Sequence, residues 1–113
     1  MIIQEMVDIL QAEVVAGATK VDNVINGGYA SDLLSNVMSQ AKTGDIWVTM
    51  HAHQNIVAVA SLLGLSAVII AGHVQPDKEA INKADAEEIP LLTTALSVFE
   101  VVGLLYSKGV KGV

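Results

Sequence analysis

The sequence of 113 residues contains no cysteine and no arginine. Without cysteine the chain has no disulfide, no thiolate nucleophile and no cysteine-ligated zinc or iron–sulfur site. Without arginine it cannot hold a phosphate or carboxylate bidentately, so backbone N–H groups, hydroxyls or lysines would have to bind any anion. Acidic residues outnumber basic ones by 12 to 6, which gives a net charge of −6. We therefore expect no nucleic-acid partner, because such proteins usually present a basic, arginine-bearing face.

Charged residues of either sign are scarce. They make up 16% of the chain, against 52% hydrophobic residues, whereas ordinary domains are about a quarter charged. The length suits one domain spanning residues 1–113. A small domain with so few charges leaves apolar surface uncovered, so we expect it to meet a partner, most simply a second copy of itself.

Long hydrophobic runs are also lacking. The longest apolar stretch, residues 56–71, is interrupted by Ser61, Gly64 and Ser66, which makes it too short and too broken to span a bilayer. The first six residues lack the basic start of a signal peptide. The sequence therefore predicts a soluble cytoplasmic protein with no membrane partner.

Short β-branched apolar runs alternate with helical stretches along the chain. Strands are expected at residues 12–16, 24–30, 45–50, 66–71 and 89–94. Helices are expected at residues 2–10, 33–41, 56–65, 77–88 and 96–108. Such alternation implies right-handed parallel crossovers. We predict a three-layer α/β/α sandwich with a mostly parallel sheet of about five strands, in which the first strands can add antiparallel at one edge.

Three of the expected helices carry further predictions. Residues 56–65 are apolar nearly all round, which is typical of a helix buried on both sides. Residues 77–88 form the polar helix, with only Ile81 and alanines for packing, and should lie outside. The apolar helices 56–65 and 96–106 are the candidates for a dimer face, because one of them can cover the sheet while the other meets a partner.

Small and polar residues gather where the parallel strands are expected to end. Ligands of such sheets bind outside the carboxyl ends of the strands, near a switch in strand order. The candidate ligand-binding residues are Gly27, Gly28, Ser31, Asp32, Thr49, His51, His53, Asn55, Gly72, His73, Thr93, Thr94 and Ser97. All three histidines of the chain are in this set.

Each of these candidates also has a structural interpretation. Gly27 and Gly28 suit a bulge or tight turn with positive φ, and Ser31 with Asp32 suits a helix N-terminus. The segment from Thr93 to Ser97 suits a cap of the last helix. His51 and His53 would share one face of a strand, but no third ligand is evident, so we predict no metal site. Capping or contact with solvent also accounts for the histidines.

Motifs of catalysis are absent from the sequence. It has no phosphate-binding P-loop, no Gly-x-Gly-x-x-Gly and no Gly-x-Ser-x-Gly. Acidic residues cluster on the expected polar helix, at Asp77, Glu79, Asp85, Glu87 and Glu88. Nothing indicates an activated nucleophile with its base. We predict no enzymatic activity and no cofactor, and we leave open a small histidine-dependent enzyme and a structural interaction subunit without ligand.

Several segments resemble the DRTGG domain. They are residues 25–35 (INGGYASDLLS), 45–49 (DIWVT), 53–61 (HQNIVAVAS), 89–94 (IPLLTT) and 99–100 (FE). The resemblance covers nearly the whole chain and is closest to the stand-alone form of the domain, since other members are fused to CBS domains, to phosphotransacetylase or to a pyrophosphatase. Gly27 and Gly28 match the two glycines of the family's name, whereas its arginine has no counterpart here.

This resemblance implies a fold similar to the N-terminal domain of HPr kinase/phosphorylase. It does not carry kinase activity to a chain without the phosphate loop, and no catalytic residues are established for the family. It implies a regulatory or ligand-sensing module that tends to dimerise. The combined prediction is a non-enzymatic homodimer that binds a small metabolite, a nucleotide or a protein partner through the strand-end loops.

Overall fold

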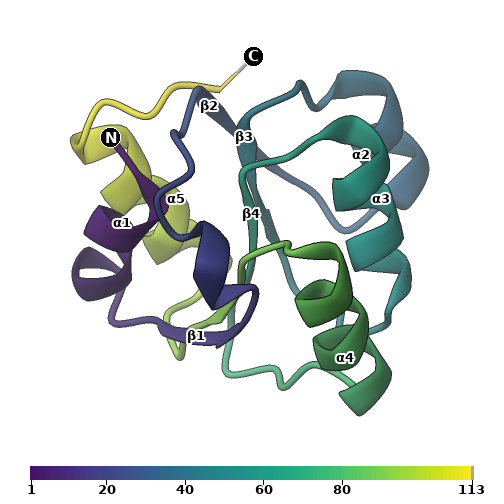
Figure 1. Cartoon of the computed structure of the whole chain (residues 1–113). Coiled ribbons are helices and arrows are strands. Elements are labelled where there is room, and N and C mark those ends of the chain that lie inside the picture. Colours follow the sequence, from purple (N-terminus) through teal and green to yellow (C-terminus); the bar gives the residue numbers. More distant parts are fainter. Residues whose placement is uncertain (113) are drawn as a thin grey trace.

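The computed structural model describes residues 1–112, in which a five-stranded sheet lies between two layers of helices (Figure 1). The strands are β1 (Glu13–Ala16), β2 (Gly27–Ala30), β3 (Asp45–Thr49), β4 (Ala67–Ile70) and β5 (Leu91–Thr93). The helices are α1 (Ile3–Ile9), α2 (Leu34–Gln40), α3 (Asn55–Leu63), α4 (Lys78–Glu87) and α5 (Val98–Ser107), with a 3₁₀ turn, η1 (Ala18–Lys20). The predicted α/β/α sandwich is confirmed.

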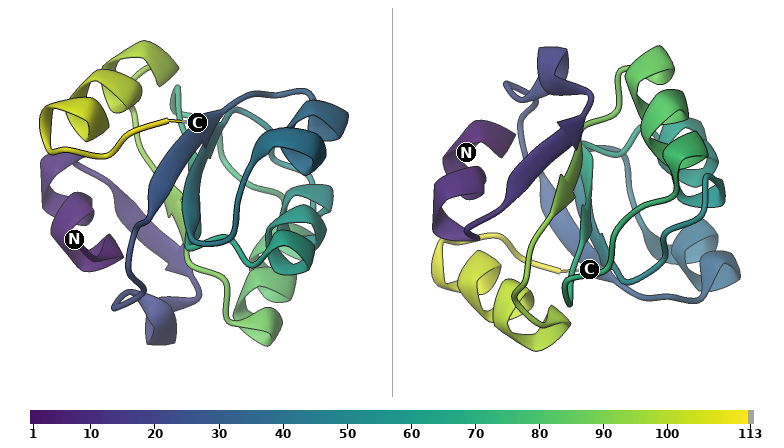
Figure 2. Two further views of the ribbon diagram at one scale, coloured as in Figure 1. Left: turned by 90° about the horizontal axis from the view of Figure 1, so that it is seen from above. Right: turned by 90° about the horizontal axis from the view of Figure 1, so that it is seen from below.

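The strand order β1-β5-β4-β3-β2 explains how the layers form. Strands β2 to β5 are parallel, and β3, β4 and β5 each lie beside the strand that precedes them in the chain, whereas β1 pairs antiparallel with β5 at the edge opposite β2. Because the three parallel crossovers all step in the same direction, right-handedness places α2, α3 and α4 on one face. Helices α1 and α5 cover the other face (Figure 2).

Strand β4 divides the hydrophobic core in two. All four of its residues are fully buried, and successive side chains point to opposite faces. Val68 and Ile70 pack in the core under α2, α3 and α4. Ala67 and Ile69 pack in the core under α1 and α5. A strand buried on both faces must be apolar throughout, and this is why the continuous run at residues 66–71 was diagnostic.

The predicted roles of the outer helices are partly confirmed. Helix α4 buries only Ala80 and Ala84, as expected of the polar helix. The expectation that residues 56–65 are buried on both sides is wrong, because Leu62 in α3 is 71% exposed. Helix α3 lies in an outer layer and has only one face against the sheet. None of the helices described here is long and apolar enough to cross a lipid bilayer.

Two local predictions around β2 are wrong. Gly27 and Gly28 lie in the extended strand and do not have positive φ. Ser31 does not cap a helix, since α2 begins three residues later, at Leu34. The Ser31 hydroxyl instead accepts the Leu33 N–H at 3.1 Å and shapes the turn between the strand and the helix. The two glycines are part of β2, and Ser31 shapes the turn that follows it. The preference of glycine for positive φ and of serine for helix caps therefore did not determine their roles.

Gly27 is required by close packing. A Cβ at this position would lie 2.8 Å from Oδ1 of Asp45 and 3.0 Å from the carbonyl oxygen of Lys111. The Asp45 carboxylate is buried and accepts the Lys42 N–H at 2.9 Å, so it cannot move away freely. The neighbouring Gly28 N–H donates to the Lys111 carbonyl at 2.9 Å. The absence of a side chain thus lets a buried carboxylate and the C-terminal segment approach β2.

Replacing Gly27 by alanine should therefore destabilise the fold by about 1–3 kcal/mol, the usual cost of overpacking. Gly28→Ala is the matched control, because its Cβ would meet Val110 Cγ1 at 3.4 Å, an ordinary contact. Urea denaturation of both variants measures the difference. Equal stability of the two variants would contradict the packing argument.

Candidate ligand site at the carboxyl end of the sheet

The connections that follow β4 and β5 leave the sheet on opposite sides. Strand β4 continues to α4, which packs with α2 and α3, whereas β5 continues to α5, which packs with α1. In a parallel sheet a crevice opens outside the carboxyl ends of two neighbouring strands whose connections diverge in this way. Strand order therefore selects the β4–β5 junction among the strand ends.

A cavity of about 240 Å³, open to solvent, lies at this junction. We call it the strand-end crevice; its lining residues are Gln11, Ala12, Glu13, His73, Gln75, Thr93, Thr94 and Ala95. His73 and Gln75 follow β4, and Thr94 follows β5. Because β1 runs antiparallel to β5, the beginning of β1 lies at the end of the sheet where β4 and β5 finish, and it adds Gln11 and Glu13 to the lining.

The two loops of the crevice are held together through their backbones. Gly72 and His73 both have positive φ, of 73° and 63°, a conformation uncommon for a residue other than glycine. The Gly72 N–H donates to the Leu96 carbonyl at 2.7 Å, and the His73 N–H donates to the Thr94 carbonyl at 3.0 Å. This arrangement leaves the His73 side chain exposed at the crevice.

The two threonines of the crevice differ in role. The Thr94 hydroxyl is buried and donates to the Leu10 carbonyl at 2.8 Å, which ties the end of α1 to the end of β5. Thr93 is the last residue of β5 and also lines the crevice. Exposed imidazole and amide groups of His73, Gln11 and Gln75 complete a polar lining suited to hydrogen bonding.

A second polar group stands at the ends of β2 and β3. Oδ1 of Asp32 accepts the Thr49 hydroxyl at 2.7 Å and the Met50 N–H at 2.8 Å. The Thr49 hydroxyl accepts the His51 N–H at 3.2 Å, and the His51 ring contacts the Asp32 carbonyl oxygen. These side chains bind the backbone where the strands end, so the cluster holds two loops in place.

The environment of Asp32 favours the ionised form of its carboxyl. Partial burial by itself would raise the pKa of the Asp32 carboxyl. The hydrogen bonds from the Met50 N–H and the Thr49 hydroxyl, together with the nearby His51 ring, outweigh burial and hold the pKa below its ordinary value. Asp32 is therefore a charged acceptor at neutral pH.

The remaining candidates lie elsewhere. His53 Nδ1 accepts the Asn55 N–H at 3.1 Å at the start of α3. The Ser97 hydroxyl accepts the Glu100 N–H at 3.2 Å, which confirms the predicted cap of α5. Gly27 begins β2 and pairs with Asp45, the first residue of β3, so the two glycines lie toward the opposite end of the sheet.

Of the thirteen candidates, the crevice brings together His73, Thr93 and Thr94, with Gly72 beside them. Sequence reasoning missed Gln11, Glu13 and Gln75, although the possible antiparallel strand at the sheet edge was a signal for the first two. Within residues 1–112, no three side chains of histidine, aspartate or glutamate are placed to hold a metal ion.

Residues 5–107 match the family model of the DRTGG domain. The chain belongs to the DRTGG domain family. This DRTGG domain is similar to a crystal structure of the CBS and DRTGG domains of the regulatory region of Clostridium perfringens pyrophosphatase, complexed with its activator diadenosine tetraphosphate. The TM-score is 0.75 at 23% identity, over 90% of this chain and 44% of that one. The chain thus spans less than half of that regulatory region, and the likeness is one of fold. A search of curated proteins gives no match.

Replacing Asp32 of this DRTGG domain by alanine removes two hydrogen bonds to the end of β3. At pH 7 the substitution should lower the free energy of unfolding by about 1 kcal/mol, a low value because the site is exposed. The pKa of Asp32 is lower in the folded chain. Its contribution is therefore complete above the unfolded pKa of about 4 and is lost as the pH falls through the folded pKa.

Urea denaturation of wild type and Asp32→Ala at pH 7 and at pH 3 measures this effect. The difference between the two proteins should shrink at the lower pH. Asp22→Ala, at an exposed position, is the control and should change little at either pH. A difference that is the same at both pH values would contradict the assigned role of the Asp32 carboxylate.

Proposed function

We propose that this DRTGG domain is a non-enzymatic regulatory module that acts as a homodimer and senses a small molecule in the strand-end crevice. The proposal rests on the position of the cavity. The cavity lies where α4 and α5 diverge, which is where parallel sheets bind ligands. A ligand there would contact the loops that lead into both helical layers.

The lining of the crevice favours a neutral polar ligand or the neutral part of a nucleotide. It offers amide, imidazole and hydroxyl groups from Gln11, Gln75, His73 and Thr93. The lining includes the acidic residue Glu13, which would repel a phosphate bound beside it, and it includes no lysine. We therefore expect hydrogen bonds to a base, a sugar or a small polar metabolite.

Binding without catalysis fits the chemistry of the same residues. A catalytic histidine usually has a carboxylate that orients it and a nucleophile within reach. The ion pair found in the described part of the chain joins Lys20 to Glu88, and no acidic side chain there is paired with His73. This supports a sensing role, in which a ligand shifts the population toward the arrangement that it binds better.

A thermal-shift screen with adenosine, AMP, ATP and diadenosine tetraphosphate tests the proposal. Adenine compounds come first because the similar regulatory region was crystallised with such an activator. A compound that binds the folded chain should raise its melting temperature. His73→Asn should remove the shift and keep the fold, since asparagine tolerates positive φ. His53→Asn is the matched control outside the crevice and should keep the shift.

Two results would count against the crevice. Loss of the shift in His53→Asn, with the shift kept in His73→Asn, would place the ligand at the start of α3. Failure of every adenine compound, followed by failure of a panel of neutral polar metabolites, would contradict small-molecule sensing and favour a protein partner.

A further inference from the structure

Helix α5 has apolar residues on two faces. Its inner face buries Val101 and Leu105 in the core. Its outer face presents Phe99, Val102, Gly103 and Tyr106, which follow one another at the three- and four-residue spacing of a single helix stripe. The Phe99 side chain is 86% exposed and that of Tyr106 is 48% exposed. The helix thus covers the sheet and still carries an apolar outer stripe.

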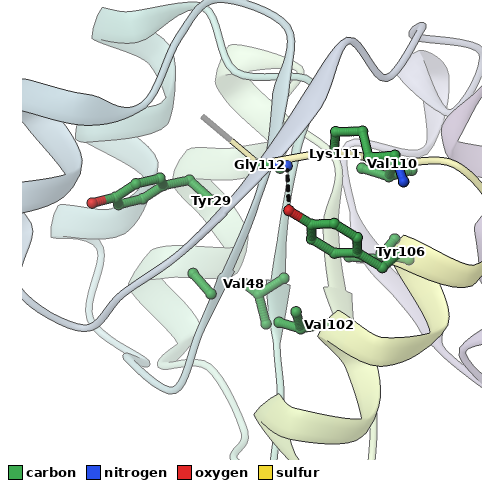
Figure 3. Close-up of a pocket in the computed structure, with 10 residues that line it drawn as sticks. Tyr29, Val48, Val102, Tyr106, Val110, Lys111 and Gly112 are labelled. Carbon is green, nitrogen blue, oxygen red and sulfur yellow. Dashed lines mark hydrogen bonds between the residues drawn. The ribbon is translucent and has the colours of Figure 1, made fainter.

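A cavity runs beside this stripe, between α5, β2 and the C-terminal segment (Figure 3). Its volume is about 240 Å³, and we call it the α5 groove. It is lined by Gly28, Tyr29, Ala30, Val48, Val102, Leu105, Tyr106, Val110, Lys111 and Gly112. The Tyr106 hydroxyl accepts the Gly112 N–H at 3.1 Å and so holds the C-terminal segment at the groove.

We propose that a second copy of this chain docks on this face. The α5 helices of the two copies pack antiparallel about a two-fold axis at Gly103, and Phe99 of each copy enters the α5 groove of the other. This inference rests on the homodimer of the proposed function and assigns its interface.

Symmetry makes the stripe and the groove complementary. Phe99 lies about 6 Å along the helix from Gly103, at 1.5 Å per residue. A two-fold axis perpendicular to the helix places it at the level of residue 107 of the other copy, beside the part of the groove formed by Leu105, Tyr106 and Val110. An apolar cavity of about 150 Å³ can hold benzene, so the groove has room for the Phe99 ring.

Gly103 is where the two helices would cross. A Cβ at this position meets nothing within 4 Å inside the chain, so the chain's own packing does not require glycine. Glycine is unfavourable inside a helix relative to alanine. A close approach by a second backbone is a physical reason to have it there.

The charges of α5 fit the antiparallel arrangement. Glu100 lies in the first turn and Lys108 follows the last turn. Antiparallel packing brings Glu100 of one copy toward Lys108 of the other and opposes the two helix dipoles. A parallel arrangement would instead align the like charges and the dipoles. The charge pattern therefore favours a second copy in the antiparallel orientation.

Gly103→Cys tests the position of the axis directly, because the natural chain has no cysteine. Two thiols beside the two-fold axis come within the Cα separation of about 4.4–6.8 Å that a disulfide spans. Mild oxidation should give a covalent dimer on a non-reducing gel. Leu62→Cys, at a 71% exposed position on α3, is the control and should not cross-link. Cross-linking of the control alone would overturn the proposed interface.

Phe99→Glu tests the insertion of the side chain. Phe99 is exposed in the single chain, so the fold should survive, while the dimer dissociation constant should rise at least about thirty-fold, as for a central interface residue. Light scattering over a range of concentrations measures it, with Leu62→Glu as the control that stays dimeric. A dimer unaffected by Phe99→Glu would overturn this interface and leave the homodimer standing. A wild type that is monomeric throughout would overturn both.

Discussion

The fold depends on one constraint, the complete burial of β4 on both faces. Ala67–Ile70 are fully buried, and the strand pairs with β3 on one side and β5 on the other. Such a strand is stable only if helices cover both faces of the sheet, because its side chains point alternately to each. The chain meets this condition by building one layer through its crossovers and the other from α1 and α5. The two layers in turn require that the connections after β4 and β5 diverge, and this divergence creates the crevice.

The sequence predicted the central elements well because their signals are local and strong. β3 and β4 appeared as apolar runs bounded by turn residues, and the structure places them within a residue or two of the expected limits. The predictions for the β2 region were wrong because contacts with residues far away in the sequence determine its conformation. Gly27 makes room for Asp45 and for the carbonyl of Lys111, which lies 84 residues further along the chain. Positive φ and helix capping are local explanations, and a long-range contact of this kind leaves no local pattern.

The candidate site also depends on long-range contacts that the sequence pattern does not reveal. Strand direction alone predicted that polar residues at or just after the ends of parallel strands, such as Thr93 and His73, would lie at the same end of the sheet. Which loops form a cavity depends on strand order, and periodicity does not give strand order. The antiparallel orientation of β1 decides that Gln11 and Glu13 join the crevice. Asp32 and Thr49 stand at strand ends as expected, yet their side chains bind each other and the Met50 N–H.

A short segment with backbone hydrogen bonds to the loop after β4 connects the crevice to α5. The Thr94 carbonyl accepts the His73 N–H and the Leu96 carbonyl accepts the Gly72 N–H, and the cap of α5 at Ser97 follows directly. A ligand seated between His73 and Thr93 would therefore act on the same hydrogen bonds that position the start of α5. It can shift a dimer equilibrium only by its difference in affinity for the two arrangements. The coupling is reciprocal, so an interface on α5 would change the affinity of the crevice by the same factor. A sensing module needs this property, and here a four-residue turn between β5 and α5 is the element through which it would act.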